Sequence, residues 1–182
     1  AGCDVRQWES DDPMPRAALL EWAQGVDGVF CVLTERIDAE LLDAAQQLRR
    51  RGGWLIVDEA FIDAEADNAI VALAGSDEAP NLIVLRSLGK FFGLAGARVG
   101  FIFAAPDILN RMNEAMGPWT VSGPAREVAR LALQDTAWQS AARPRLQAAG
   151  ERLHQLLAPL GEVKSTALFA TLSCAQSAEL YD

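Results

Sequence analysis

The chain has 182 residues, of which 51% are apolar and 23% are charged, and this composition fits one globular domain with room for part of a second. A net charge of −9 argues against a nucleic-acid partner, and the densest basic run, residues 49–51, falls at the end of a predicted helix, where cations suit the helix dipole. No apolar run approaches the roughly 20 residues of a membrane span, and no signal peptide is visible, so we expect a cytoplasmic protein without a membrane partner.

The few cysteines and the single histidine limit the kinds of catalytic and metal site that this chain can form. Cys3, Cys31 and Cys174 are widely spaced and form no Cys-x-x-Cys pair, which is typical of reduced thiols in a cytosolic protein. The only histidine, His154, falls in a predicted helix among leucines. A histidine-based catalytic dyad or a site with several histidine ligands is therefore hard to build, and we expect no metal.

Helices and strands alternate along the first half of the chain. Helices are predicted where apolar residues recur at helical spacing, and buried strands where a short run is continuously apolar. In chain order these are a helix at residues 16–24, a strand at 29–32, a helix at 38–50, a strand at 54–57, a short helix near 66–74 and a strand at 82–85.

The second half begins with the same alternation. In chain order we predict a strand at residues 99–103, helices from 106 to about 115, from 124 to about 134 and from about 138 to 157, a strand at 167–172 and the start of a helix at 176–181. Pro144 is a candidate kink in the longest helix. Because the strands read as continuous apolar runs between helices, we predict an α/β fold with a mostly parallel sheet and helices on both faces.

The segment between residues 85 and 99 concentrates the reactive groups. It contains the hydroxyl of Ser87, the amine of Lys90 and the guanidinium of Arg98. A hydroxyl and an arginine are good phosphate partners, and glycines allow the backbone to approach a ligand. Because two phenylalanines follow Lys90, we expect a desolvated amine that can act as a nucleophile. On residue types alone, a glycine-rich connection with a surface lysine and a surface arginine is the commoner alternative.

A second candidate site follows the predicted strand at 54–57. Asp58 and Glu59 stand directly after this strand, as Ser87 follows the strand at 82–85. Ligands of parallel α/β sheets bind at the carboxyl ends of the strands, so Asp58 and Ser87 are expected at one shared site. The alternative for an isolated acidic residue there is a helix cap or a loop anchor. Glu59 is expected to have a structural role or to support the site residues from behind.

The whole segment from Ser87 to Gly100 resembles the lysine segment of fold-type I enzymes that use pyridoxal 5′-phosphate (PLP), the aspartate aminotransferase superfamily. The resemblance rests on the Ser-x-x-Lys spacing, the arginine eight positions after the lysine, and the glycines between them. It implies that Lys90 forms the Schiff base with the cofactor. It also implies that Ser87 and Arg98 bind the cofactor phosphate.

The segment from Asp58 to Phe61 resembles the Asp-x-Ala-(Tyr/Phe) motif of the same superfamily. By this resemblance Asp58 pairs with the pyridine nitrogen of the cofactor, and Ala60 packs under its ring. Phe61 stands where many aminotransferases have a tyrosine. A phenylalanine cannot donate a hydrogen bond to the ring hydroxyl, so we expect that contact to be absent or to come from elsewhere.

The resemblance also implies a domain organisation. Residues 1–137 correspond to the PLP-dependent transferase-like large domain, and residues 138–182 to the start of a small α+β domain. The family's amino-terminal phosphate turn, its Asn-Pro-x-x-Pro-x-Gly loop and its substrate arginine have no counterpart in this sequence. We therefore expect a large domain that is incomplete at its amino terminus, a loop missing between Val32 and Leu33, and a truncated small domain.

Residues 117–124 match a family segment that lines the site or the subunit interface. Internal packing of Trp119 in a Pro/Gly turn is the alternative.

Within the superfamily, the Lys90 and Asp58 segments look most like the threonine-phosphate decarboxylase branch of cobalamin biosynthesis. This resemblance implies a homodimeric PLP-dependent lyase that decarboxylates a small phosphorylated amino acid, L-threonine O-3-phosphate, to aminopropanol phosphate. A histidinol-phosphate-type aminotransferase is the close alternative. A non-catalytic remnant of the same fold is a further alternative from a different functional class.

Overall fold

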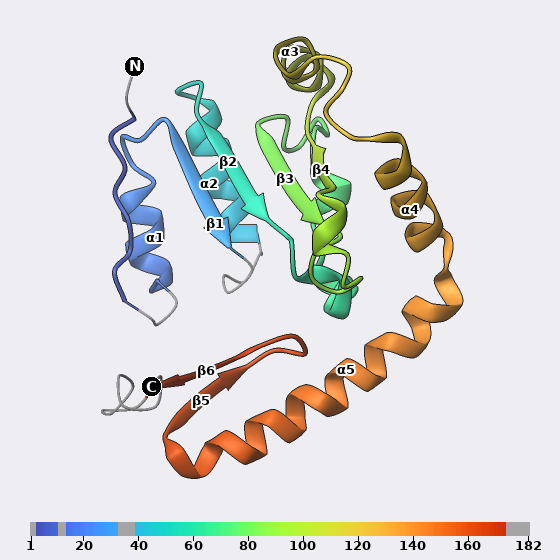
Figure 1. The fold of residues 1–182 in the computed structure, drawn as a ribbon. Helices are drawn as coiled ribbons and strands as arrows, with labels where there is room; N and C mark the ends of the chain where they lie inside the picture. Colours follow the sequence, from blue (N-terminus) through green and yellow to red (C-terminus); the bar gives the residue numbers. More distant parts are fainter. Residues whose placement is uncertain (1–2, 11–13, 33–38, 174–182) are drawn as a thin grey trace. The chain divides into compact units, whose positions relative to one another are not determined.

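The structure is a computed structural model that describes residues 3–10, 14–32 and 39–173 (Figure 1). The chain divides into two compact units. The first consists of Ala1–Glu59, Ile70–Leu85 and Ile102–Gly117, and the second of Ala60–Ala69, Arg86–Phe101 and Pro118–Asp182. The expected loop missing after Val32 and the expected helix at 176–181 fall on residues outside the described ranges.

Three parallel strands form the centre of the first unit, which confirms the predicted parallel α/β arrangement. They are β1 (Gly28–Val32), β2 (Trp54–Asp58) and β3 (Leu82–Ser87). The β1–β2 pairing runs from Gly28 opposite Trp54 to Val32 opposite Asp58, and the β2–β3 pairing from Leu55 opposite Leu82 to Asp58 opposite Leu85. A fourth strand, β4 (Gly100–Phe103), completes the sheet in the order β1-β2-β3-β4.

Alternate residues of β2 and β3 face the core. Two helices also contribute residues to this core: α1 (Arg16–Trp22) and α2 (Ala39–Arg49), which packs against β2 (Figure 1). Apolar side chains removed from water on one face of a sheet account for such packing, at about 25 cal/mol for each Å² buried. The buried cluster comprises Met14, Leu19, Cys31, Ala45, Leu48, Leu55, Val57, Ile70, Ala79, Leu82 and Val84. A further helix, α3 (Pro106–Met116), begins at a proline, where the missing N–H costs nothing.

The segment after β2 corrects the prediction of a short helix near 66–74. It forms two 3-10 helices, η1 (Ile62–Asn68) and η2 (Val71–Leu73), and Glu65 within η1 has non-helical φ and ψ angles of −131° and 51°. The backbone N–H of Ile70 donates a 2.6 Å hydrogen bond to Oε1 of Glu59. Because this side chain takes the Ile70 donor, a continuous α-helix across 66–74 cannot form. Glu59 is 1% exposed, and this hydrogen bond lets its side chain hold the backbone at Ile70.

The second unit contains the two longest helices described after β4. They are α4 (Gly123–Gln134) and α5 (Thr136–Leu157), and α5 continues through Pro144. Side chains cap both amino termini: Ser122 Oγ accepts from the Ala125 N–H at 3.4 Å and Asp135 Oδ1 from the Trp138 N–H at 2.9 Å. The domain division expected at residue 137 falls within α5 and stays a prediction.

An antiparallel hairpin packs against α5 (Figure 1). It consists of β5 (Glu162–Ser165) and β6 (Ala170–Ser173), so the strand predicted at 167–172 begins later than expected, and β5 was not predicted. A short 3-10 helix, η4 (Ala158–Leu160), joins α5 to β5. Gly150 permits the close approach, because a Cβ there would lie 2.7 Å from the carbonyl oxygen of Thr166.

None of the helices in the part of the chain that the structure describes is long and apolar enough to cross a membrane.

Asn81 is expected to be a costly polar side chain to remove from the first unit. Its Nδ2 donates to the carbonyl oxygens of Ala45 at 2.8 Å and of Gly53 at 3.0 Å, and the residue is 6% exposed. Asn81→Ala should lower the free energy of unfolding by about 2–4 kcal/mol, because two buried carbonyls lose their donor and a cavity remains. Asn113→Ala, at an exposed position of α3, should change it by less than about 0.5 kcal/mol. Urea denaturation measures both values, and equal effects would contradict this role of Asn81.

Candidate functional site

The loop from Ser87 to Gly100 is anchored by two apolar side chains that turn into the protein. Leu88 is 1% exposed and Phe91 is 4% exposed. The Gly93 N–H donates to the Lys90 carbonyl at 3.0 Å, with Gly93 at a φ of 66° that favours glycine. The Leu94 N–H donates to the Leu88 carbonyl at 2.9 Å and closes the turn. The loop that carries Lys90 is therefore a defined turn with its own hydrogen bonds.

The return of this loop into β4 follows a 3-10 helix, η3 (Ala95–Ala97). The Leu88 N–H, just after β3, donates to the Val99 carbonyl, just before β4, at 3.4 Å. The two ends of the loop are therefore joined by a hydrogen bond. Arg98 lies between η3 and β4 in the left-handed region, with φ 53° and ψ 46°, the one such non-glycine residue among those described. This conformation costs a residue with a Cβ roughly 1–2 kcal/mol, and strain of this kind is concentrated at functional sites.

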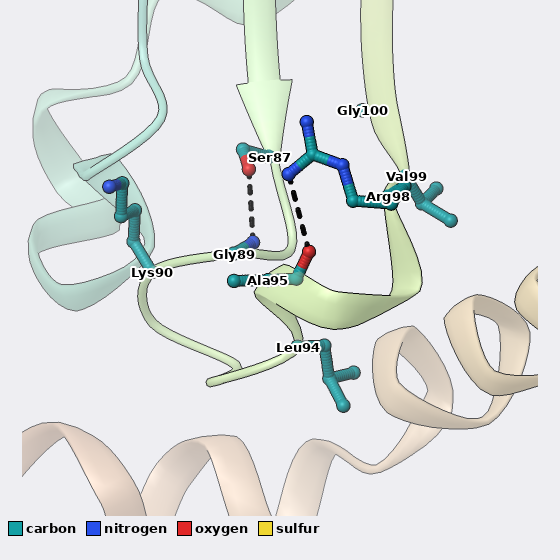
Figure 2. Close-up of a pocket in the computed structure, with 8 residues that line it drawn as sticks. All are labelled: Ser87, Gly89, Lys90, Leu94, Ala95, Arg98, Val99 and Gly100. Atoms are coloured by element: carbon teal, nitrogen blue, oxygen red, sulfur yellow. Dashed lines mark hydrogen bonds between the residues drawn. The ribbon is translucent and has the colours of Figure 1, made fainter.

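A cavity of about 300 Å³ lies within this loop (Figure 2). It brings together three of the predicted site residues: Ser87, Lys90 and Arg98. Figure 2 shows the Arg98 guanidinium on the side of the Ser87 hydroxyl, whereas Lys90 extends away from both. The other lining residues are small or apolar and were not predicted individually as site residues: Gly89, Leu94, Ala95, Val99 and Gly100.

The hydroxyl and the guanidinium are a donor set that fits a phosphate. Ser87 Oγ accepts a 2.9 Å hydrogen bond from the Gly89 N–H, which orients the hydroxyl so that its own hydrogen can be donated. A Cβ at Gly89 would lie 3.2 Å from this oxygen, so glycine keeps the approach open. The Arg98 side chain is exposed, and its Nη1 has a long contact of 3.5 Å to the Ala95 carbonyl. Arginine and hydroxyl donors of this kind bind phosphate oxygens through charge-assisted hydrogen bonds.

Lys90 is exposed, so the expectation of a desolvated amine from its apolar sequence neighbours is wrong. The ring of Phe91 is buried in the protein and so does not cover the amine, which lies next to the ring of Phe61 instead. The Lys90 Nζ lies 5.0 Å from the centroid of the Phe61 ring, a cation–π distance. Phe61 in turn packs edge-on against Phe169, with centroids 5.2 Å apart. The structure therefore brings two predicted site residues, Lys90 and Phe61, into contact.

Asp58 and Ala60 lie at the end of β2. Asp58 is the last residue of the strand and is partly buried, with Leu85 of β3 as its register partner. Ala60, also partly buried, follows the buried Glu59. Asp58 belongs to the first unit and the cavity to the second, and the predicted roles of Asp58 and Ala60 toward a cofactor stay predictions.

Two arginines near this site were not predicted from the sequence. Arg86 Nη1 lies 3.1 Å from Asp63 Oδ1, and Arg143 Nε donates a 2.9 Å hydrogen bond to the Asp63 carbonyl oxygen. The Arg143 guanidinium also lies 5.3 Å from the ring centroid of Phe91. Arg86 is next to Ser87 in the sequence, which is a signal that could have identified it. Arg143 is 80 residues from Asp63, and no local pattern predicts that contact.

Trp119 is 90% exposed, so the alternative of internal packing for this residue is wrong. Among the residues described, no group of three or more His, Cys, Asp or Glu side chains is placed to hold a metal ion.

Comparison with known proteins agrees with the resemblance of the two segments. The threonine-phosphate decarboxylase of Pseudomonas aeruginosa is 49% identical over 146 residues, which cover 79% of this chain and 43% of that protein. Histidinol-phosphate aminotransferase 1 of Legionella pneumophila (strain Lens) is 36% identical over 102 residues, which cover 56% of this chain and 28% of that protein. The chain thus matches less than half the length of either relative.

Solved structures agree on the fold. The histidinol-phosphate aminotransferase of Sinorhizobium meliloti, solved in complex with pyridoxal-5′-phosphate, superposes with a TM-score of 0.79 at 22% identity, covering 93% of this chain and 49% of that chain. At this identity the likeness establishes the fold. The family model for aminotransferase class I and II matches residues 38–181, which is most of the sequence. The chain therefore belongs to the aminotransferase class I and II family.

Proposed function

We propose that this chain binds PLP at the loop from Ser87 to Gly100, with Lys90 as the residue of covalent attachment. The observation that carries the proposal is the cavity lined by Ser87, Lys90 and Arg98 (Figure 2). PLP has a phosphate at one end and an aldehyde on its ring, and the donor pair and the amine extend to different sides of the loop. When bound, PLP supplies an electron sink for the bond that breaks at the substrate carbon.

The side chains of the loop have separate tasks. Ser87 and Arg98 bind the phosphate and so fix the position of the ring. Lys90 would hold the cofactor covalently through its amine until substrate binds. The released Lys90 amine then delivers or removes a proton at the substrate Cα. Its exposure in the cavity makes it accessible to both partners.

Asp58, Ala60 and Phe61 complete the proposed cofactor site. We propose that the Asp58 carboxylate stabilises a protonated pyridine nitrogen by its opposite charge, and that Ala60 packs under the ring. Support comes from the position of both residues at the end of β2, where ligands of parallel sheets bind. Phe61 provides an aromatic surface next to the Lys90 amine. It has no hydroxyl that could donate a hydrogen bond to the oxygen on the cofactor ring.

For the whole protein we propose decarboxylation of L-threonine O-3-phosphate to aminopropanol phosphate. The Cα–carboxylate bond breaks, CO2 leaves, and Lys90 supplies the proton that Cα receives. The relative from Pseudomonas aeruginosa, named a threonine-phosphate decarboxylase, supports this choice through its 49% identity. A histidinol-phosphate-type aminotransferase is the second candidate, supported by the 36% identity of the Legionella relative.

Three further properties follow from the resemblance and belong to the same proposal. The protein acts in cobalamin biosynthesis, is located in the cytoplasm and forms a homodimer. Large apolar side chains that are exposed in the second unit support an oligomer, because an interface would remove them from water. They include Trp119 at 90% exposure and Leu131 at 54%.

The phosphate role of Arg98 predicts a selective loss of affinity. In the full-length protein, Arg98→Ala should weaken PLP binding by about 10- to 150-fold, because a charge-assisted hydrogen bond contributes about 1.5–3 kcal/mol. Ser87→Ala should act in the same direction. Binding of pyridoxal, which lacks the phosphate, should be unchanged in both variants. Equilibrium titrations followed by absorbance measure these affinities.

The control for lost positive charge is Arg111→Ala, at an exposed position of α3 in the first unit. It should bind PLP and pyridoxal like the unmodified protein. An equal loss of pyridoxal and PLP affinity in Arg98→Ala would contradict the phosphate role.

The reaction is tested by two parallel assays of the full-length protein. With L-threonine O-3-phosphate we expect release of CO2 and aminopropanol phosphate. With histidinol phosphate and 2-oxoglutarate we expect no glutamate. Glutamate from the second assay without CO2 from the first would assign the protein to the aminotransferase alternative. Inactivity in both, with PLP bound, would favour a non-catalytic relative of the fold.

A further inference from the structure

Arg143 of α5 contacts both of the segments that flank the Lys90 amine. Its guanidinium lies 5.3 Å from the ring centroid of Phe91, the residue that follows Lys90. Its Nε donates a 2.9 Å hydrogen bond to the carbonyl oxygen of Asp63. Asp63 lies two residues after Phe61, whose ring centroid is 5.0 Å from the Lys90 Nζ. One side chain thus connects the backbone that carries the lysine with the segment that lies next to its amine.

The groups that Arg143 connects are themselves held by neighbours. Phe91 is 4% exposed and packs edge-on against Trp138, with centroids 5.4 Å apart. The carboxylate of Asp63 is paired with Arg86 at 3.1 Å, and these two side chains are only 14% and 19% exposed. Arg143 therefore joins two groups that are each fixed by another side chain, and it is the residue that contacts both the Phe91 ring and the backbone of Asp63.

The guanidinium suits this double contact. It is planar, so it can stack on an aromatic ring while an N–H in its plane donates to a carbonyl. A lysine ammonium at the same place could approach the ring as a cation but would not reproduce the planar fork.

We propose that Arg143 is a positioning residue for Lys90, and this inference rests on the proposed binding of PLP by the loop. By holding Phe91 and the segment of Phe61 together, Arg143 restricts where the exposed Lys90 amine can go. The amine then meets the cofactor aldehyde when Ser87 and Arg98 hold the phosphate. Arg143 does not line the cavity, so phosphate binding does not depend on it.

The test separates covalent attachment from phosphate binding in the full-length protein. The first measurement is the rate at which PLP becomes attached to the protein, trapped by borohydride. The second is the affinity for pyridoxine 5′-phosphate, which has the phosphate but no aldehyde. Arg143→Ala should slow attachment about tenfold or more, since a misplacement of about 1 Å can cost on the order of 100-fold. Its affinity for pyridoxine 5′-phosphate should stay within about twofold.

Two further variants test whether the effect depends on the cation at position 143. Arg143→Lys should recover part of the attachment rate because it keeps a cation near Phe91. Arg145→Ala, at an exposed position two residues further along α5, should attach PLP like the unmodified protein. Attachment at the unmodified rate in Arg143→Ala would overturn the proposal. A parallel loss of pyridoxine 5′-phosphate affinity would also overturn it, because the role would then be general support of the loop.

Should Arg143→Ala fail to fold, Phe91→Leu and Arg143→Lys carry the test. Each should slow attachment, and the double variant should slow it by less than the product of the two single effects, because both act through one contact. Independent effects that multiply would overturn the proposal. An unmodified protein that never attaches PLP would instead overturn the proposed function, so the two failures are distinguishable.

Discussion

The burial of Leu88 and Phe91 is the constraint on which the candidate site depends. The two side chains are 1% and 4% exposed, and a buried apolar side chain of this size contributes about 1.5–3 kcal/mol. They lie on either side of Gly89 and Lys90, so their burial fixes the backbone of these two residues. The cavity beside Ser87 and Arg98 and the accessible amine are consequences of this anchoring (Figure 2).

The strands and the reactive segment could be predicted because both depend on local signals. The apolar runs at 29–32, 54–57 and 82–85 all form strands that pair in parallel. Strand β5 escaped prediction because Glu162–Ser165 is short, charged and mostly exposed. The helix expected near 66–74 failed because a side chain distant from it, Glu59, takes a backbone donor that a helix would need.

The geometry around Lys90 could not be predicted because it depends on contacts between distant segments. The sequence suggested that two following phenylalanines would surround the amine, yet Phe91 is buried and Lys90 is exposed. The ring next to the amine is Phe61, and its packing partner Phe169 comes from the turn between β5 and β6. The resemblance of the segment to a known family indicated which residues could react, while only the structure showed what holds them.

The most direct test of the account is to identify the residue that carries PLP. The full-length protein is incubated with PLP, reduced with borohydride and digested, and the modified peptide is located by mass spectrometry. The account predicts a phosphopyridoxyl group on Lys90 and none after Lys90→Ala. Modification of Lys164, the other lysine in the sequence, or of neither lysine would contradict it.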